Sequence, residues 1–287
     1  MTPRHVLIAG FGYVGRALGQ ELAAAGHRVV GLRRSKAPVP PGVEALRADL
    51  LDPSTLTVPS EVDAVVYAVS PAERSESAYR AAYVEGPANL ARALRAAGAP
   101  VERLLFVSST AVYGQDDGSW VDERSPTEPA TPTARVLLDG EQAAQELGFR
   151  TTVLRLAGIY GPDRTWLVRR VEAGEVRVEG PDHVGPPRYG NRIHRRDCAG
   201  ALAHLLTHPD PPPTLIGVDD DPAPLAEVYR FVAERLGVPA PPAGEVGRGR
   251  GGNKRCRNGE LRRTGYALRV PSYREGYPEV IDRMIRH

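Results

Sequence analysis

The chain has 287 residues, of which 41% are hydrophobic and 25% charged, and its formal net charge is +2. These values are ordinary for a globular protein and exclude a strongly basic, nucleic-acid-binding surface. Apolar runs stay well below the ~18 residues of a membrane-spanning helix, and two cysteines are too few for a disulfide framework. Because no signal-peptide pattern precedes the first predicted strand, we expect a cytoplasmic protein that binds neither membranes nor nucleic acid.

A glycine-rich turn follows the first predicted strand. The strand covers residues 6–9, the turn reads GFGYVG over 10–15, and a helix over 14–25 and a strand over 29–32 come next. This order and spacing are typical of a βαβ unit that binds a dinucleotide. The free amides and dipole of the helix N-terminus favour the phosphates. The predicted cofactor contacts in the turn are Gly10, Phe11, Gly12, Tyr13, Val14 and Gly15.

The residues after the second strand indicate which nicotinamide cofactor binds. A site for NAD usually has an acidic residue there, which holds the ribose 2′-hydroxyl. This chain has Arg33, Arg34 and Ser35 instead, and its next carboxylate is Glu44. Because an arginine fork matches the geometry of a phosphate, we expect NADP(H), with NAD(H) as the less favoured alternative.

Strands and helices continue to alternate along the first half of the chain. Strands are expected over 43–47, 64–69, 103–107 and 152–156, and helices over 77–97 and 133–147. This alternation predicts an α/β fold with a doubly wound, Rossmann-like parallel sheet that binds ligands beyond the carboxyl ends of its strands.

Two domains are predicted. Residues 1–165 form an NADP(H)-binding domain, and parts of 190–220 complete its sheet. Residues 166–287 are rich in proline and glycine, with one clear helix over 225–236, and form mainly a small C-terminal substrate-binding lobe.

Four segments in chain order carry a resemblance to a known family. They are the glycine turn, SSTAVYG at 108–114, RLAGIYGP at 155–162 and NRIHRRD at 191–197. With these motifs the chain resembles the extended short-chain dehydrogenases/reductases, the superfamily of sugar-nucleotide epimerases and dehydratases. The resemblance covers nearly the whole chain.

The resemblance implies further site residues. Ser109, together with Thr110, would orient the reacting group of the substrate. Tyr160, Arg164 and Arg192 would contact the substrate. The implied contacts to the adenine, ribose, diphosphate and nicotinamide of the cofactor are Asp49, Leu50, Ala68, Val69, Ser70, Ser108, Leu156, Ala157 and Gly158.

The resemblance also implies an assembly. In relatives, the helices that correspond to 77–97 and 133–147 form a dimer seam, and we therefore expect a homodimer by analogy.

The chain departs from the family at the catalytic pair. Relatives have a Tyr that transfers the proton and a Lys that lowers the pKa of this Tyr, spaced YxxxK on the helix after the serine-rich motif. Alignment on Glu141 places Thr133 and Leu137 at these two positions, and neither Lys36 nor Lys254 has a Tyr four residues before it. The chain therefore resembles atypical members of the superfamily.

Three hypotheses for the function follow. The first is an NADP(H)-dependent oxidoreductase that moves hydride to or from a small carbonyl, imine or sugar-like substrate, with Tyr83 as the leading proton donor and Arg135 and Tyr160 as weaker candidates. A substrate that arrives activated, such as an iminium, would need little acid catalysis. The second is a sugar-nucleotide epimerase or dehydratase, which normally needs the missing Tyr. The third is a non-catalytic NADP(H)-binding regulatory protein.

Other charged residues are expected to be structural. Arg155 is predicted to form an ion pair, and His194 to support the fold rather than catalysis. The closely spaced pair His204 and His208 lies at the end of a predicted helix, where it favours the helix dipole. We therefore expect no metal.

Overall fold

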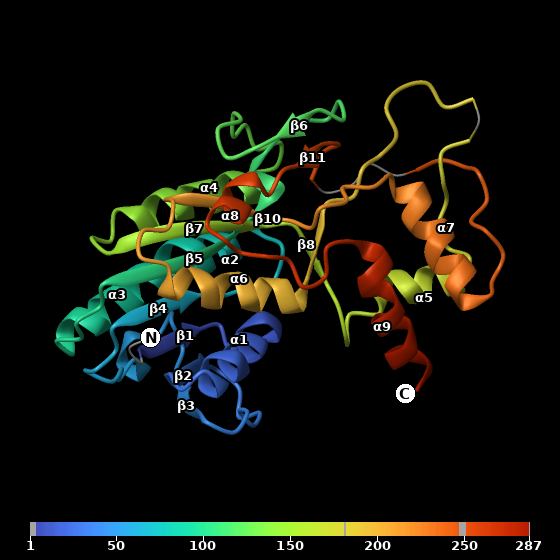
Figure 1. Ribbon diagram of the computed structural model, residues 1–287. Helices are drawn as coiled ribbons and strands as arrows, with labels where there is room; N and C mark the ends of the chain where they lie inside the picture. The colour runs from blue at the N-terminus through green and yellow to red at the C-terminus, as the bar shows by residue number, and fades with distance from the viewer. Residues whose placement is uncertain (1–3, 181, 247–250, 287) are drawn as a thin grey trace.

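Seven short apolar segments form one parallel sheet in the computed structural model, which describes residues 4–180, 182–246 and 251–286. The order of the strands is β10-β7-β5-β4-β1-β2-β3 (Figure 1). It contains the doubly wound arrangement of nucleotide-binding folds, so the predicted α/β, Rossmann-like fold is confirmed. The strands are β1 (His5–Ala9), β2 (Arg28–Arg33), β3 (Val43–Arg47), β4 (Ala64–Tyr67), β5 (Arg103–Ser109), β7 (Arg150–Leu156) and β10 (Thr214–Gly217).

Helices cover both faces of the sheet because successive residues of each strand point to opposite sides. Val6 and Ile8 of β1 pack in one core with α1 and α6, whereas Leu7 and Ala9 pack in a second core with α3 and α4. Figure 1 shows α6 in front of the strands and α4 on the other side. The helices of these two layers are α1 (Tyr13–Ala24), α2 (Glu76–Arg80), α3 (Gly86–Ala96), α4 (Pro132–Gln145) and α6 (Arg195–Thr207).

The helix predicted over 77–97 contains a local change of geometry. Helices α2 and α3 are continuous with each other through η2 (Ala81–Glu85), which is a π-helical turn. The end of the helix is as expected, because Gly98 adopts the left-handed conformation with a φ of +68°.

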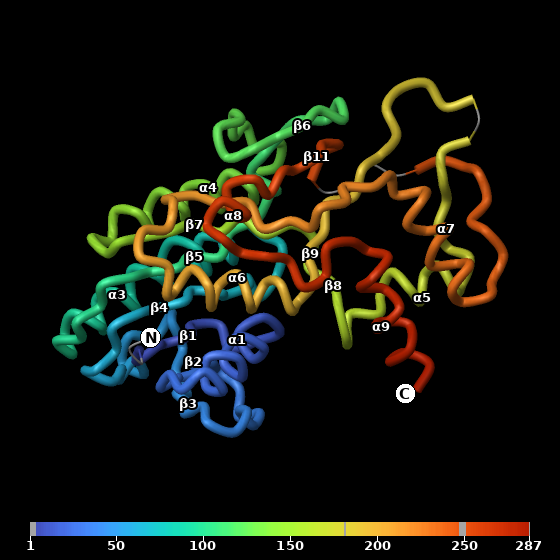
Figure 2. Tube along the Cα trace, viewed as in Figure 1, coloured from blue at the N-terminus to red at the C-terminus, as the bar shows by residue number. Residues whose placement is uncertain are grey.

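A smaller lobe follows the sheet. Its core joins α5 (Trp166–Glu172), α7 (Leu225–Leu236) and α9 (Tyr273–Ile285) through buried side chains such as Val168, Val232, Tyr273 and Ile281. The parallel pair β8 (Gly158–Tyr160) and β9 (Arg192–His194) lies between the sheet and this lobe (Figure 2). The remaining short elements are η1 (Pro53–Thr55), η3 (Thr110–Val112), β6 (Trp120–Val121), β11 (Arg255–Cys256) and α8 (Gly259–Arg263).

The chain leaves the sheet after β7 and returns to it. Helix α6 packs on α1, and β10 pairs in parallel with β7 at the edge of the sheet.

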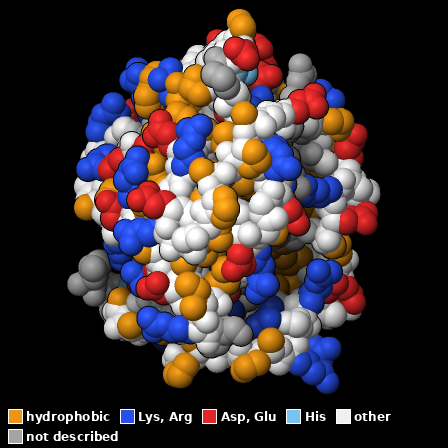
Figure 3. Space-filling view, turned by 90° about the vertical axis from the view of Figure 1, so that its right-hand side faces the viewer, with side chains coloured by type: hydrophobic (Ala, Val, Ile, Leu, Met, Phe, Trp, Pro, Cys, Tyr) orange, Lys and Arg blue, Asp and Glu red, His pale blue; other side chains and the backbone are white. Residues whose placement is uncertain are grey.

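The predicted domain boundary between residues 165 and 166 stays a prediction, and the outer ends of the two predicted domains lie outside the described residues. None of the described helices has the length and apolar character required to cross a bilayer. On the face toward the small lobe, basic and acidic side chains are interspersed (Figure 3).

His194 connects β9 to α6 and is fully buried. Its Nδ1 accepts a hydrogen bond from the Arg196 amide and caps the helix. Burial, reinforced by the charges of Arg196 and Arg195, lowers the pKa of His194 to about 4. The Glu279 carboxylate lies 3.7 Å from Nε2 and favours the charged ring, but burial outweighs this single half-exposed partner. His194 is therefore neutral in the folded protein.

We predict that stability falls between about pH 6.5 and pH 4 because of His194. The folded-state pKa lies below the unfolded value, so protons bind preferentially to the unfolded chain as the pH falls through this window. A shift from 6.5 to about 4 corresponds to about 3 kcal/mol. In denaturant titrations, His194→Asn, which keeps a capping group, should lose less stability across this window than the wild type. Equal losses in the two proteins would contradict the prediction.

Candidate functional site

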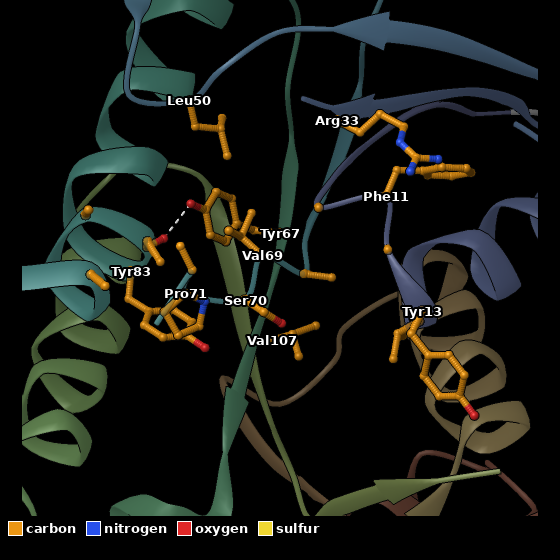
Figure 4. Close-up of a pocket in the computed structure, with 18 of the residues that line it drawn as sticks. Phe11, Tyr13, Arg33, Leu50, Tyr67, Val69, Ser70, Pro71, Tyr83 and Val107 are labelled. Carbon is orange, nitrogen blue, oxygen red and sulfur yellow. Dashed lines mark hydrogen bonds between the residues drawn. The ribbon is translucent and has the colours of Figure 1, made fainter. Parts of the chain in front are cut away.

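A cavity of about 850 Å³ opens at the carboxyl ends of the central strands. Its size is typical of a pocket for a small ligand or cofactor. Figure 4 shows Phe11, Tyr13 and Arg33 on one side and Leu50, Tyr67 and Tyr83 on the other. The predicted site residues on its wall are Gly10, Phe11, Gly12, Tyr13, Val14, Arg33, Arg34, Ser35, Asp49, Leu50, Ala68, Val69, Ser70, Tyr83, Ser108, Ser109, Leu156, Ala157 and Arg164.

The three glycines of the turn have different geometrical roles. Gly10 has a φ of +89°, and a Cβ on it would lie 2.5 Å from the carbonyl of Ala68. A Cβ on Gly15 would lie 2.6 Å from the carbonyl oxygen of Gly10, so this glycine lets α1 approach the turn. A Cβ on Gly12 would meet nothing within 4 Å, so its backbone faces open space in the cavity. The turn therefore leaves room for a ligand at the N-terminus of α1.

The N-terminus of α1 is electrostatically suited to an anion. Gly12 provides no side-chain cap, and the first turn of α1 contains no acidic residue. The guanidinium carbons of Arg164 and Arg195 lie 4.3 and 4.5 Å from the centre of the Tyr13 ring. The Tyr13 hydroxyl donates a hydrogen bond to the carbonyl of Pro162 at 2.6 Å, which joins the glycine turn to the segment after β8. A diphosphate fits this positive environment.

At the end of β2 the cavity is bordered by basic and hydroxyl side chains. The Arg33 Nε donates to the Ser35 Oγ at 2.9 Å, and Arg34 and Ser35 are exposed to solvent. Asp49, on the facing loop, accepts a hydrogen bond from the amide of Leu51. The carbonyl of Leu50 is held by the side-chain amide of Asn89 at 2.7 Å. This end therefore combines two guanidinium groups with one carboxylate.

The opposite end contains two hydroxyl groups among apolar side chains. The Ser109 Oγ accepts a hydrogen bond from the amide of Ala111 and caps η3, so its proton is free to be donated elsewhere. Tyr83 lies on the π turn, and Figure 4 shows it on the same side of the cavity as Leu50 and Tyr67. Burial raises the pKa of Tyr83 well above its usual value, and the neighbouring Tyr79 adds to this shift. Tyr83 is thus a protonated hydroxyl at neutral pH.

A buried ion pair lies behind this end of the cavity. Arg155 on β7 and Glu141 on α4 are joined by a bidentate contact, with Nη2 and Oε2 2.6 Å apart. Ser108 donates to the same carboxylate, and the Arg155 Nη1 donates to the hydroxyl of Tyr113 at 2.8 Å. The predicted ion pair of Arg155 is confirmed. Ser108 therefore lines the cavity while its hydroxyl is turned toward Glu141.

The positions of the missing catalytic pair have other roles. Thr133 lies in the first turn of α4, and Leu137 is buried in the core between α4 and the sheet. Lys36 is exposed, whereas the buried Lys254 donates to the carbonyl of Tyr113 at 2.7 Å. Both lysines are among the described residues, and neither lies on the cavity wall.

Five predicted site residues lie away from the wall. Gly15 is beneath the glycine turn, and Thr110 is buried in η3. Tyr160 packs against His194 and Tyr277. The remaining two, on the β8–β9 pair, are Gly158 and the buried Arg192, whose guanidinium lies over the Tyr273 ring.

Several residues of the wall were not predicted from the sequence. Tyr67, at the end of β4, is one of them, and the loop that follows contributes Ala72 and Glu73. The two loop residues could have been predicted, because they follow directly after a predicted strand end. The inward orientation of Tyr67 could not, because it depends on the helix packed over it. Within the described residues, no group of three metal-ligating side chains comes together.

Comparisons with known proteins agree with this geometry. The sequence model of the "NAD dependent epimerase/dehydratase family" matches residues 6–216. The chain is 32% identical over 220 residues to the protein YeeZ of Escherichia coli K12, a match that covers 72% of this chain and 74% of YeeZ. It is 30% identical over 215 residues to the dTDP-4-dehydrorhamnose reductase of Mycolicibacterium smegmatis, which covers 72% of this chain and 61% of that protein.

A solved structure extends the similarity to the whole chain. The putative NAD-dependent epimerase/dehydratase from Methylobacillus flagellatus is 35% identical, with a TM-score of 0.80 and complete coverage of both chains. The fold, the glycine turn and these matches lead to one conclusion. The chain belongs to the NAD dependent epimerase/dehydratase family, a family of NAD(P)-dependent oxidoreductases and epimerases/dehydratases.

Proposed function

We propose that this protein is a reductase that uses NADPH to reduce a small carbonyl or imine substrate. The observation that carries this proposal is the arrangement of the cavity, which leaves room for a dinucleotide at the glycine turn and has the hydroxyls of Ser109 and Tyr83 at its other end. NADPH, when bound, supplies the hydride. The chain itself supplies orientation through Ser109 and a proton through Tyr83.

The preference for NADPH is inferred from the end of β2. Arg33, Arg34 and Ser35 border the cavity where the 2′-position of the adenosine ribose would lie. A hydrogen bond to a charged group contributes roughly 1.5–3 kcal/mol, so one such contact favours NADPH over NADH by roughly 10- to 100-fold. Asp49 and Leu50 would contact the adenine.

The other proposed cofactor contacts lie at the carboxyl ends of successive strands of the sheet. The amides of the glycine turn would hold the diphosphate. Ala68, Val69, Ser70 and Ser108 would line the ribose and diphosphate. Leu156 and Ala157, followed by Gly158, would flank the nicotinamide.

The protonation state of Tyr83 favours reduction over epimerisation. Oxidation of an alcohol, the first step of an epimerase or dehydratase, needs a base that takes the hydroxyl proton. The carboxylates on the described wall are Asp49, at the adenosine end, and Glu73, which is exposed and accepts a hydrogen bond from Ser75. A Tyr83 that keeps its proton serves as a donor to a carbonyl oxygen and is a poor base.

The substrate would enter beside Arg164, the predicted substrate contact that lies on the wall. Tyr160 and Arg192 lie behind the wall and would influence the substrate indirectly, through the β8–β9 pair. We further infer a cytoplasmic homodimer, paired through the outer faces of α2–α3 and α4. Within one chain, an ion pair of Arg80 and Asp139, 3.6 Å apart, joins α2 to α4.

Two alternatives lead to different observations. The family favours a sugar-nucleotide epimerase or dehydratase, which would release a rearranged sugar nucleotide without net consumption of cofactor. The absence of the Tyr–Lys pair favours a non-catalytic NADP(H)-binding regulator, which would bind cofactor without turnover. Net oxidation of NADPH with a member of a carbonyl and imine panel separates the reductase from both.

Replacement of Arg33 and Arg34 by alanine should weaken NADPH binding by roughly 10- to 100-fold and change NADH binding little. Calorimetric titration of nucleotide-free protein measures both affinities. Arg28→Ala is the matched control, because Arg28 is an exposed arginine at the opposite end of the same strand. Wild-type protein that binds NADH as tightly as NADPH would refute the cofactor assignment.

Tyr83→Phe should lower kcat by about 10²- to 10⁴-fold, the usual contribution of a positioned proton donor, and leave the Kd for NADPH unchanged. Steady-state kinetics with the best substrate of the panel measures this loss. Tyr79→Phe is the control, since Tyr79 packs against Tyr83 but does not reach the wall. A kcat unaffected by Tyr83→Phe would exclude this residue as the donor.

A further inference from the structure

The π turn η2 places Tyr83 and has an identifiable cause. In this turn the amide of Gly86 donates to the carbonyl of Ala81, five residues back, instead of to Ala82 as in an α-helix. The next residue along the chain is Pro87, which has no N–H. In the π pattern the carbonyl of Ala82 would need the amide of residue 87, so it has no backbone donor.

A side chain from the sheet replaces the missing donor. The hydroxyl of Tyr67, at the end of β4, donates to the carbonyl of Ala82 at 2.5 Å, as the dashed line in Figure 4 shows. Gly86 makes room for this contact, because a Cβ there would collide with the Tyr67 hydroxyl. The Tyr67 ring is fixed by stacking on Phe106, with ring centres 5.6 Å apart. Tyr67 is buried, so its hydroxyl has a defined position.

The same packing fixes Tyr83. Its ring meets the edge of Phe106, with ring centres 6.2 Å apart. On the other side, α4 approaches closely at Gly140, where a Cβ would lie 2.7 Å from the Tyr83 carbonyl. The backbone of the π turn therefore decides where the Tyr83 hydroxyl lies in the cavity. Turns of this kind are frequent at functional sites.

We propose that Tyr67 is a positioning residue that acts through Tyr83, an inference that rests on the proposed function. Two hydrogen-bond patterns compete in this segment. In the π pattern Gly86 bonds Ala81 and Tyr67 bonds Ala82, whereas in the α pattern Gly86 bonds Ala82 directly. Without the Tyr67 hydroxyl, the π pattern leaves a buried carbonyl unpaired, which is unfavourable. In the α pattern the Tyr83 carbonyl lacks a donor instead, because its partner would be the amide of residue 87, which Pro87 does not have. Without the Tyr67 bond the two patterns each leave one carbonyl unpaired, so the segment loses its preference for the π turn and Tyr83 moves relative to Ser109.

The structural test does not depend on any substrate. Crystal structures of the wild type and of Tyr67→Phe, which keeps the ring and its stacking, are compared at residues 81–87. We expect the Gly86 amide to leave the Ala81 carbonyl in the variant, in all molecules or in a second conformer, and the Tyr83 hydroxyl to leave its position with it. An unchanged π turn in Tyr67→Phe would overturn the proposal, whether or not the protein proves to be a reductase.

The kinetic test uses a double-mutant cycle with Tyr67→Phe and Tyr83→Phe. Tyr67→Phe alone should lower kcat at least about tenfold, part of the loss expected for the donor itself, with the Kd for NADPH unchanged. In the Tyr83→Phe background it should cause no further loss. If the kcat of the double variant is lowered by the product of the two single losses, Tyr67 does not act through Tyr83. This result would also overturn the proposal.

Two further variants complete the test. Tyr266→Phe is the matched control, because this buried hydroxyl also bonds a single residue, Asp197, at 2.8 Å to the carboxylate and 3.5 Å to the carbonyl. It lies away from the cavity wall, so its loss should leave kcat unchanged. Gly86→Ala serves if Tyr67→Phe does not fold, because its Cβ would displace the Tyr67 hydroxyl from the Ala82 carbonyl. It should shift Tyr83 and lower kcat in the same way, and a wild-type Tyr83 position in this variant would count against the proposal.

Discussion

The buried pair of Arg155 and Glu141 is the interaction on which the site depends. It joins β7 to α4, and through Ser108 and Tyr113 it also fixes the end of β5 and the segment beyond it. Loss of one partner from a buried pair typically costs about 3–5 kcal/mol, because the other charge remains without compensation. The floor of the cavity is therefore held by charge-assisted hydrogen bonds that do not face the ligand. Since the Ser108 hydroxyl is engaged in this network, the adjacent Ser109 is the serine available to a substrate.

The cavity separates two kinds of chemistry. Its end at β2 has guanidinium groups and exposed side chains, which suit recognition of a phosphate by charge. Its other end has apolar walls and neutral hydroxyls, where an unpaired charge would be costly. In relatives, a lysine would bring a positive charge to this second end. Here Leu137 fills the corresponding position in the core, so the local electrostatics differ although the fold is the same.

The sheet and the part of the cavity wall at the glycine turn could be predicted from the sequence because their signals are local. Apolar runs such as residues 6–9 form the strands, and the glycine turn has the required order of strand, turn and helix. The position of Tyr83 could not be predicted, since the π turn depends on a hydroxyl from β4, 15 residues away in the sequence. The inward placement of Tyr160 and Arg192 was also missed, because the β8–β9 pair that turns them away from the wall is short and has no clear pattern. Helix α9, which contains Pro278, was not predicted either.

The return of the chain to the sheet affects the order in which the protein can fold. Strand β10 and helix α6 are made after the first 165 residues, yet β10 covers the edge of β7, and α6 covers α1 and one face of the sheet. During synthesis, the nucleotide-binding half thus leaves the ribosome with an open sheet edge and an uncovered apolar face. Pairings between distant segments form slowly, and such surfaces are prone to aggregation. The first half therefore completes its folding only after much of the second has been translated.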